Sequence, residues 1–350
     1  MFKITNGISD ARLSLEAAFL DPDYWNEIDT MADFNEAEKM FGAKRLEPAA
    51  RDCGTLHPRL GPKVHTPSSS ARDPMTPVPR MIEIDYEKVN RYWEEATPSI
   101  LGPYMMDDFG FPASAGDFRF RAESRIVRRL TRDVKRDGAV LDLGSGIGVW
   151  AEGFARRFSL VTAVERSRNL FESLQRRCSP YPNLRPIHGD VLTFEPDARY
   201  DLVFLGGLLM YLNERDLIAL LRKLVRCIEP GGMILCREST VRGNAVALRG
   251  DYQVVYRSVS DYRRIFGQCG LTIRHVERNE PYVLIEMGSE LVEKWRKTVP
   301  ARFQVLRAIG HLTYFGLRLG YPWITRIPKA LGIAFPRLEN HFFVLRADAS

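Results

Sequence analysis

The sequence predicts an α/β fold built on a mostly parallel sheet, and two observations support this prediction. Across residues 81–281, short apolar stretches alternate with longer amphipathic ones, which is typical of strands that alternate with helices. The first apolar stretch, 139–143, runs directly into a glycine-rich turn at 144–148. The chain has 350 residues, of which 45% are hydrophobic. Global disorder, collagen-like repeats and a coiled coil are therefore excluded as descriptions of the whole.

The individual elements follow from residue type and spacing. Short runs of aliphatic and aromatic residues predict strands at 139–143, 160–165, 184–190, 200–205, 233–237, 271–277 and 341–346. Amphipathic stretches predict helices at 84–95, 119–135, 149–158, 168–178, 214–228 and 260–269. Pro230, Gly231 and Gly232 predict a turn before the fifth strand, because proline and glycine interrupt regular structure.

Changes in composition divide the chain into four parts. Residues 1–46 are an acidic segment, and residues 47–80 are rich in proline. Because proline fixes φ and removes a backbone donor, 47–80 is predicted to be an extended linker, with a docking arm that folds on a partner as the alternative. Residues 81–281 together with 339–350 form the expected α/β domain. Residues 282–338 are predicted to be a basic, aromatic helical insertion before the last strand.

Charge and cysteine content narrow the class of protein. A net charge of +6 is mild for this length and does not by itself indicate a nucleic-acid partner. The five cysteines are scattered without a C-x-x-C pair, which favours reduced thiols, and no metal site is predicted. From the sequence we expect no signal peptide, and no apolar run reaches the ~20 residues needed to span a bilayer. The expected location is cytoplasmic, with membrane association left open.

The chemistry is predicted where the first three strands end. A glycine turn between a strand and a helix brings backbone N–H groups and a helix N-terminus close to a ligand. Glu165 ends the second strand about twenty residues later, where a carboxylate can accept hydrogen bonds from a ribose diol. Asp190 follows the third strand. Since the carboxyl ends of parallel strands meet at one edge of a sheet, we expect these groups to form one nucleotide-type site.

These motifs together resemble those of the class I S-adenosylmethionine-dependent methyltransferases. The segments that carry the resemblance are 140–148, Glu165, 189–191, 200–206 and 221–235. The resemblance implies a Rossmann-like sheet with the strand order 3-2-1-4-5-7-6 and an antiparallel strand 7. It also implies that the cofactor is S-adenosylmethionine rather than NAD. The cofactor-binding residues that it implies are Asp142, Gly144, Ser145, Gly146, Glu165, Arg166, Asp190, Val191 and Gly206.

A narrower, partial likeness to the protein N-terminal (X-Pro-Lys) amine methyltransferases lies at the edges of this domain. Tyr92 and Trp93, followed by 98–102, resemble that family's substrate-side segment, and 255–266 resembles its late helix. After strand five, however, the chain has Arg237, Glu238 and Ser239 where that family has an Asp-Asn pair. The predicted function is therefore methyl transfer to a small-molecule or lipid-linked acceptor. An N-terminal amine methyltransferase and a non-catalytic binding protein with the same fold are the alternatives.

Two residues are candidates for work on the acceptor. Tyr211 follows the fourth strand, where a phenol could orient the acceptor or receive a proton; the alternative is a core tyrosine that simply finds a partner. Glu238 follows the fifth strand and is expected to face either the acceptor or solvent. A base is needed only if the acceptor is a hydroxyl or arrives protonated.

The basic segment 294–337 leaves several partners open. It could be an amphipathic lid or a dimer helix whose apolar side covers the pocket. It could instead contact an anionic membrane or receive a lipid-linked acceptor. RNA is the least favoured partner, although basic and aromatic residues are interleaved here. The oligomeric state is not predicted.

Overall fold

The computed structural model describes residues 83–96, 109–250 and 252–347. All of them belong to one of the chain's two units, Pro62–Ser350. The predictions made for the acidic segment 1–46, the linker 47–80 and the motif 98–102 concern residues outside these ranges.

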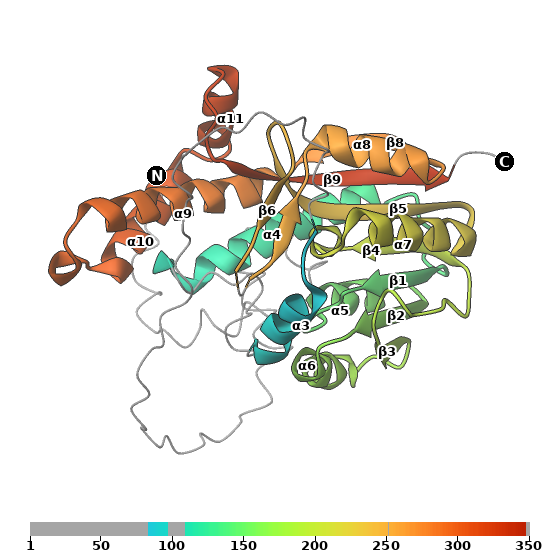
Figure 1. Ribbon diagram of the computed structural model, residues 1–350. Coiled ribbons are helices and arrows are strands. Elements are labelled where there is room, and N and C mark those ends of the chain that lie inside the picture. The colour runs from blue at the N-terminus through green and yellow to red at the C-terminus, as the bar shows by residue number, and fades with distance from the viewer. Residues whose placement is uncertain (1–82, 97–108, 251, 348–350) are drawn as a thin grey trace, which may run out of the picture. The chain divides into compact units, whose positions relative to one another are not determined.

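Within the described residues, seven strands form one mixed sheet (Figure 1). The strands are β1 (Ala139–Leu143), β2 (Leu160–Glu165), β3 (Leu184–His188), β4 (Tyr200–Leu205), β5 (Ile228–Val241), β8 (Leu271–Arg278) and β9 (Leu338–Ala347). Their order is β3-β2-β1-β4-β5-β9-β8. The β1, β2, β3, β4 and β5 strands pair in parallel, whereas β9 runs antiparallel to β5 and β8. The predicted strand order, with an antiparallel last strand, is confirmed.

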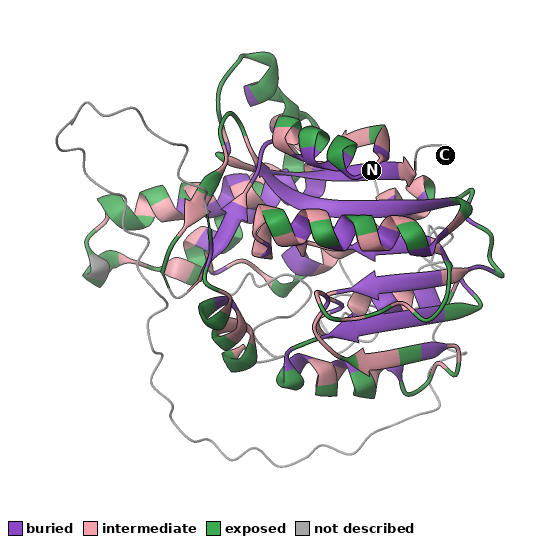
Figure 2. Ribbon diagram, turned by 45° about the vertical axis from the view of Figure 1, so that its right-hand side comes forward, coloured by how far each residue is buried: buried purple, intermediate pink, exposed green. Residues whose placement is uncertain are grey.

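Helices cover both faces of this sheet. The α-helices of the described residues are α3 (Tyr86–Glu95), α4 (Ala113–Leu130), α5 (Val149–Ala155), α6 (Arg168–Cys178), α7 (Glu214–Cys227), α8 (Val259–Gln268), α9 (Glu280–Thr298), α10 (Leu306–Leu319) and α11 (Trp323–Ala330). The apolar sides of α7 and α8 pack on one face, with Leu141 and Leu143 of β1. The α4, α5 and α6 helices pack on the other face, with Val140. Because both faces are covered, the central strands β1 and β4 are buried along nearly their whole length (Figure 2).

Local signals start two of these helices. The Ser167 side chain accepts a hydrogen bond from the Leu170 N–H at the start of α6. Ser258 and Asp261 form a capping box at the start of α8. Each cap satisfies backbone donors that the first helical turn leaves without a partner. The two helices therefore begin at Arg168 and Val259, within one residue of the predicted starts at 168 and 260.

Two features differ from the expected elements. The β5 strand begins at Ile228, so the predicted turn at Gly231 (φ +81°) lies inside it as an irregularity in the pairing with β4. A hairpin of β6 (Val246–Leu248) and β7 (Val254–Tyr256) was not predicted, because three-residue strands carry too little periodicity to be recognised. Of the segment 255–266, which resembles a late helix, only the part from Val259 onward is helical; its first two residues belong to β7.

The segment between β8 and β9 is helical. The α9 helix begins at Glu280, and α10 and α11 follow it before β9 starts at Leu338. The start of α9 is tied to β9, because the Asn279 N–H donates to the Asn340 carbonyl (2.8 Å). Among the described residues, no helix is long and apolar enough to cross a membrane.

Candidate active site

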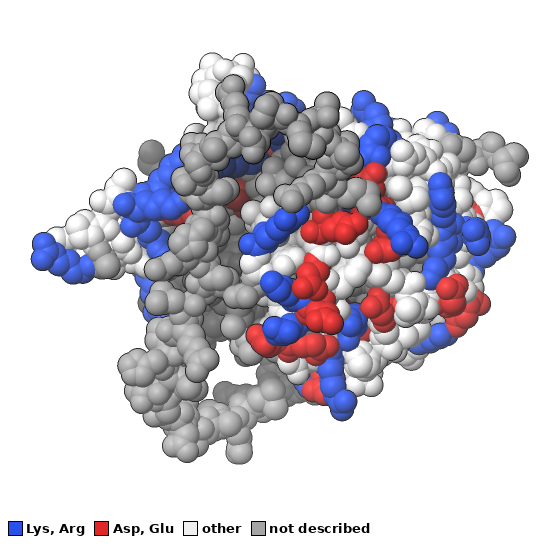
Figure 3. All heavy atoms as spheres, viewed as in Figure 1, with Lys and Arg blue, Asp and Glu red and all other residues white. Residues whose placement is uncertain are grey.

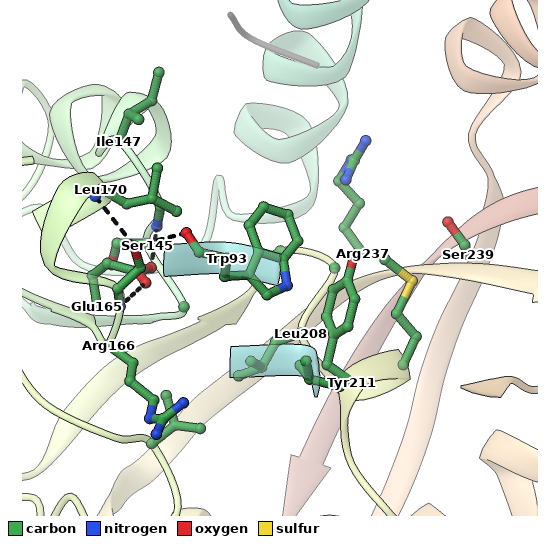
Figure 4. A pocket seen from close by; sticks show the side chains of 18 of the residues that line it. Trp93, Ser145, Ile147, Glu165, Arg166, Leu170, Leu208, Tyr211, Arg237 and Ser239 are labelled. Carbon is green, nitrogen blue, oxygen red and sulfur yellow. Dashed lines mark hydrogen bonds between the residues drawn. The ribbon is translucent and has the colours of Figure 1, made fainter. Parts of the chain in front are cut away.

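A cavity of about 510 Å³ opens at the carboxyl ends of the parallel strands. One end is formed by the glycine turn after β1 and by the tips of β2 and β3. The other end is formed by residues of the β5 strand, the β6–β7 hairpin and the α9 helix. The close-up in Figure 4 shows Glu165 and Ser145 at one side, Arg237 and Ser239 at the other, and Trp93 and Tyr211 between them.

The glycine turn is shaped by backbone conformations that favour glycine. Gly144 and Gly146 have φ values of +69° and +55°, in the left-handed region where a side chain would be strained. The N–H groups of Gly144 and Ser145 donate to the Val164 carbonyl at 2.9 and 3.0 Å. This ties the turn to β2. A Cβ atom at Gly146 would meet no atom within 4 Å, so the space above the turn is open to a ligand.

Glu165 contacts this turn directly. Its Oε2 accepts from the Gly146 N–H (2.7 Å) and its Oε1 from the Ser167 N–H (2.8 Å). Burial raises the pKa of this carboxyl, and these two backbone N–H groups oppose the rise. Each carboxylate oxygen can accept more than one hydrogen bond. Glu165 therefore fixes the turn and still offers acceptor sites to the cavity that it lines.

The tip of β3 supplies the next group along the same edge. Asp190 Oδ2 lies 3.0 Å from Arg166 Nε, and its Oδ1 accepts from the Leu192 N–H (2.9 Å). Arg166, Asp190 and Val191 all line the cavity. Eight of the nine residues expected to bind the cofactor line this one cavity: Gly144, Ser145, Gly146, Glu165, Arg166, Asp190, Val191 and Gly206.

Asp142, the ninth expected residue, is not part of the cavity wall. It is 1% exposed, and its Oδ2 has no hydrogen-bond partner among the described residues. Burial raises the pKa of Asp142 to about 7, which the nearby Glu165 charge reinforces. Ser145 Oγ donates to the Asp142 backbone carbonyl (2.8 Å). Asp142 thus supports the glycine turn from below the cavity wall.

Tyr211 belongs to an aromatic group in the middle of the cavity. Its hydroxyl lies 2.8 Å from the Tyr252 hydroxyl, and its ring meets the Trp93 ring edge-on at 5.4 Å. Tyr256 and Tyr282 line the same wall. Burial raises the pKa of Tyr211 well above its usual range. Tyr211 is therefore a neutral phenol that can orient a ligand by hydrogen bonding.

Glu238 does not face solvent, which was one of its two expected positions. The side chain is 0% exposed, and it is not among the described residues that line the cavity. Its Oε1 accepts from the N–H groups of Leu208 and Leu209, each at 3.1 Å, in the turn that carries Tyr211. Burial raises the pKa of Glu238 to about 7. The fold thus turns this side chain inward, and Glu238 holds the turn after β4.

A buried ion cluster beside the cavity was not predicted from the sequence. Glu123 accepts from Arg119 Nε (3.0 Å), Arg237 Nε (2.8 Å) and Asn279 Nδ2 (2.7 Å). Burial alone would raise the pKa of Glu123, but Arg237 and Arg119 hold it at about 2. Arg119 and Arg237 both line the cavity. These residues come from α4, β5 and the start of α9, so no local motif marks them.

Glu286 is the second acidic residue that sequence reasoning missed. It lines the cavity from α9, together with Tyr282, Ile285 and Ser289. Burial raises the pKa of Glu286 to about 7, the Glu290 charge adds to the rise, and Arg119 opposes it. A carboxyl with this pKa exchanges its proton near neutral pH. The spacing of these four residues along α9 is that of one helix face, which is the signal that could have identified them.

The residues also match known proteins. A family model described as a methyltransferase domain matches residues 140–232, which include the glycine turn, Glu165 and Asp190. A phosphoethanolamine N-methyltransferase from Triticum aestivum is 27% identical over 53% of this chain and 37% of its own length. A ribosomal RNA small subunit methyltransferase A from Dehalococcoides mccartyi is 28% identical over 69% of this chain and 84% of its own.

A third relative and a solved structure agree with these. An alpha N-terminal protein methyltransferase from Drosophila melanogaster is 27% identical over 54% of this chain and 68% of its own. The solved structure of a SAM-dependent methyltransferase from Leishmania major, 15% identical, covers 75% of this chain and 82% of its own with a TM-score of 0.50, which shows the fold. The chain spans little more than a third of the wheat relative. Together with the sheet order, these matches identify a methyltransferase domain of the class I, S-adenosylmethionine-dependent type within this chain.

Proposed function

We propose that this protein transfers a methyl group from S-adenosylmethionine to a small-molecule or lipid-linked acceptor bound in the tyrosine-lined end of the cavity. One observation carries the proposal. One cavity is lined by the glycine turn and Glu165 and, farther along, by Tyr211, Tyr256 and Glu286. A methyltransferase must hold two molecules next to each other, because methyl transfer is an in-line displacement that depends on alignment.

The glycine-turn end fits the cofactor. In this proposal Gly144, Ser145 and Gly146 face the methionine part, and Glu165 accepts hydrogen bonds from the ribose. Arg166, Asp190 and Val191 flank the adenine, and Gly206 closes the methionine side. Asp142 acts indirectly, through the turn that it supports. The bound cofactor supplies an activated methyl group, and the protein's part is to orient and to exclude water.

The tyrosine-lined end of the cavity fits an acceptor that must lose a proton. Glu286, with a pKa of about 7, is suited to take a proton from an ammonium or hydroxyl group near neutral pH. The rings of Trp93, Tyr211 and Tyr256 offer faces and edges to an organic cation or an apolar group. The methyl acceptor would then lie between Glu286 and the cofactor end of the cavity.

The proposal is tested by incubating the protein with a radiolabelled methyl donor and a cell extract, then separating lipids, proteins and small metabolites. Label in the lipid or small-metabolite fraction supports it. Calorimetry with S-adenosylhomocysteine runs in parallel: absence of both heat and label overturns the proposal and favours the non-catalytic alternative. A Glu165→Ala variant is the matched control, since its loss of labelling ties the signal to this cavity.

Protein N-terminal amines are a second candidate acceptor. The segment with the likeness to that family packs at this cavity: Trp93 lines it, and the Tyr92 ring meets the Tyr252 ring at 5.0 Å. The Drosophila relative is named for the same activity. The discriminating experiment is methylation of a synthetic X-Pro-Lys peptide against the same peptide with an acetylated N-terminus. Label confined to the free peptide, with none in small metabolites, selects this candidate.

A further inference from the structure

The helices α10 and α11 carry apolar side chains that the fold leaves exposed. They are Leu312, Phe315, Leu319, Trp323, Ile327 and Leu331, which we call the apolar stripe. Leu319 is 90% and Trp323 is 70% exposed. On α10 the spacing of Leu312, Phe315 and Leu319 is that of one helix face, while Gly310 and Tyr314 on the opposite side are buried. Leu312, Phe315 and Leu319 therefore form an outward face of α10, and Trp323 and Ile327, four residues apart, share a face of α11.

Exposed basic residues lie on both helices: Arg307 and Arg318 on α10, and Arg326 and Lys329 on α11. The Arg318 guanidinium stacks on the Phe118 ring of α4, 4.2 Å from its centre. The guanidinium of Arg326 lies 5.9 Å from the centre of the exposed Trp323 ring. No acidic residue occurs between Glu293 and Glu339 in the sequence. Figure 3 shows blue side chains next to white ones on this part of the surface.

Among the described residues, those that line the cavity end at Ser289 on α9, so the stripe is not part of the cavity wall. A dimer through a two-fold axis would bring this surface against its own copy, and the arginines and lysines would then face like charges. Base stacking on RNA uses aromatic rings, whereas four of the six residues of the stripe are Leu or Ile.

We propose that the apolar stripe and the basic residues of these helices bind the surface of an anionic lipid bilayer. The aliphatic side chains would enter the boundary between headgroups and acyl chains, as they do in amphipathic helices that lie in the interface. Trp323 has the amphipathic ring that favours this depth. The arginines and Lys329 would reach the lipid phosphates with their charged ends while their stems cover apolar surface. This proposal is independent of the acceptor.

Vesicle sedimentation with the full chain tests it. Vesicles of phosphatidylcholine containing phosphatidylserine are compared with pure phosphatidylcholine, at low and high salt. We expect binding to the anionic vesicles that weakens with salt. The Arg326→Gln/Lys329→Gln variant should lose affinity on the order of tenfold or more, since each basic residue contributes about fivefold. The Leu312→Ser/Leu319→Ser variant should lose at least about tenfold, and Leu160→Ser, an exposed leucine at the start of β2, should bind normally.

The outcomes separate the membrane from the other partners. Absence of binding to anionic vesicles at low salt by the folded protein overturns the proposal. Binding that survives the Leu312→Ser/Leu319→Ser change also overturns it, because another part of the chain then binds the lipid. A dimer in light scattering that this double variant abolishes, without vesicle binding, assigns the stripe to self-association instead. Tryptophan emission should shift to the blue when the protein binds vesicles. Loss of this shift in the Trp323→Phe variant supports insertion at α11.

Discussion

Three buried glutamates of this protein have different pKa values because their neighbours differ. Glu123 is held at a pKa of about 2, against the effect of burial, by two arginines. Burial raises the pKa of Glu238 and of Glu286 to about 7, because it outweighs the opposing charges of Arg237 and Arg119. Of these three residues, Glu286 alone lines the cavity, and it is the one we assign to proton transfer.

The Glu165→Ala variant should bind S-adenosylhomocysteine more weakly by about 1.5–3 kcal/mol, because charge-assisted hydrogen bonds to the ligand are lost. Calorimetry measures this directly. Glu172→Ala, at an exposed position on α6, is the matched control and should bind normally. Because Glu165 also holds the N–H groups of Gly146 and Ser167, a thermal melt accompanies the titration. Unchanged affinity in a folded Glu165→Ala protein would show that the ribose lies elsewhere.

The Glu286→Gln variant should lower kcat about 10²–10⁴-fold, as expected for loss of a general base. A base acts only when deprotonated, so kcat/KM of the unchanged enzyme should rise as the pH increases through about 7, and the variant should lose that rise. Glu293→Gln, on the same helix but paired with Lys297, is the control. A variant with normal kcat and the original pH profile would remove Glu286 from the chemistry.

At the scale of elements, α9 joins the cavity to the helices that carry the apolar stripe. Tyr282 and Glu286 of α9 line the cavity, and α10 packs against the loop before α4 through Gly310, which lies against the backbone of Gly110. Two backbones approach this closely only where a side chain is missing. Gly310 therefore determines how closely α10 approaches the backbone of Phe109 and Gly110.

Gly310→Ala should lower the free energy of unfolding by about 1–3 kcal/mol, because the added methyl would overlap the Gly110 carbonyl and force a shift. Gly316→Ala on the same helix is the matched control. Its Cβ would meet no atom within 4 Å, so it should instead raise the free energy of unfolding by about 0.5–1 kcal/mol through helix propensity. Urea denaturation measures both. Equal effects of the two substitutions would contradict the close contact at Gly310.

At the scale of the whole molecule, buried titratable groups determine how stability depends on pH. Burial raises the pKa values of Asp142, Glu238 and Glu286 to about 7, and it lowers that of His341 to about 4. Above a pH of about 5, the three carboxyls hold protons in the folded state that the unfolded chain has released. Between pH values of about 4 and 6.5, His341 has the opposite effect, because the unfolded chain binds a proton there that the folded state does not. Three carboxyls oppose this one histidine, so their effect on stability is the larger one.

The free energy of unfolding should therefore fall as the pH rises from about 5.5 to about 8, on the order of 1–3 kcal/mol, since the folded state binds more protons over this range. Urea titrations at several pH values measure the slope. Glu238→Gln, which keeps an oxygen for the Leu208 and Leu209 N–H groups, should make the slope shallower. A stability that increases over the same pH range would show that these carboxyls are ionised in the folded protein.

The sequence by itself determined the sheet and the edge where ligands bind. Alternating apolar runs and amphipathic stretches predict the strands and helices because side-chain periodicity is a local property. The glycine turn and Glu165 are recognisable for the same reason: they lie about twenty residues apart on neighbouring strands. The strand order itself came from the family resemblance.

The tertiary structure alone decided which side chains reach the cavity. Glu238 and Glu286 are both glutamates in ordered elements, yet the first turns under the loop after β4 and the second faces the cavity from α9. The Glu123 cluster joins residues more than a hundred positions apart. Such positions depend on how distant elements pack, which no local pattern encodes. The same holds for the apolar stripe: periodicity shows that α10 is amphipathic, but only packing shows which of its faces has no partner within the described chain.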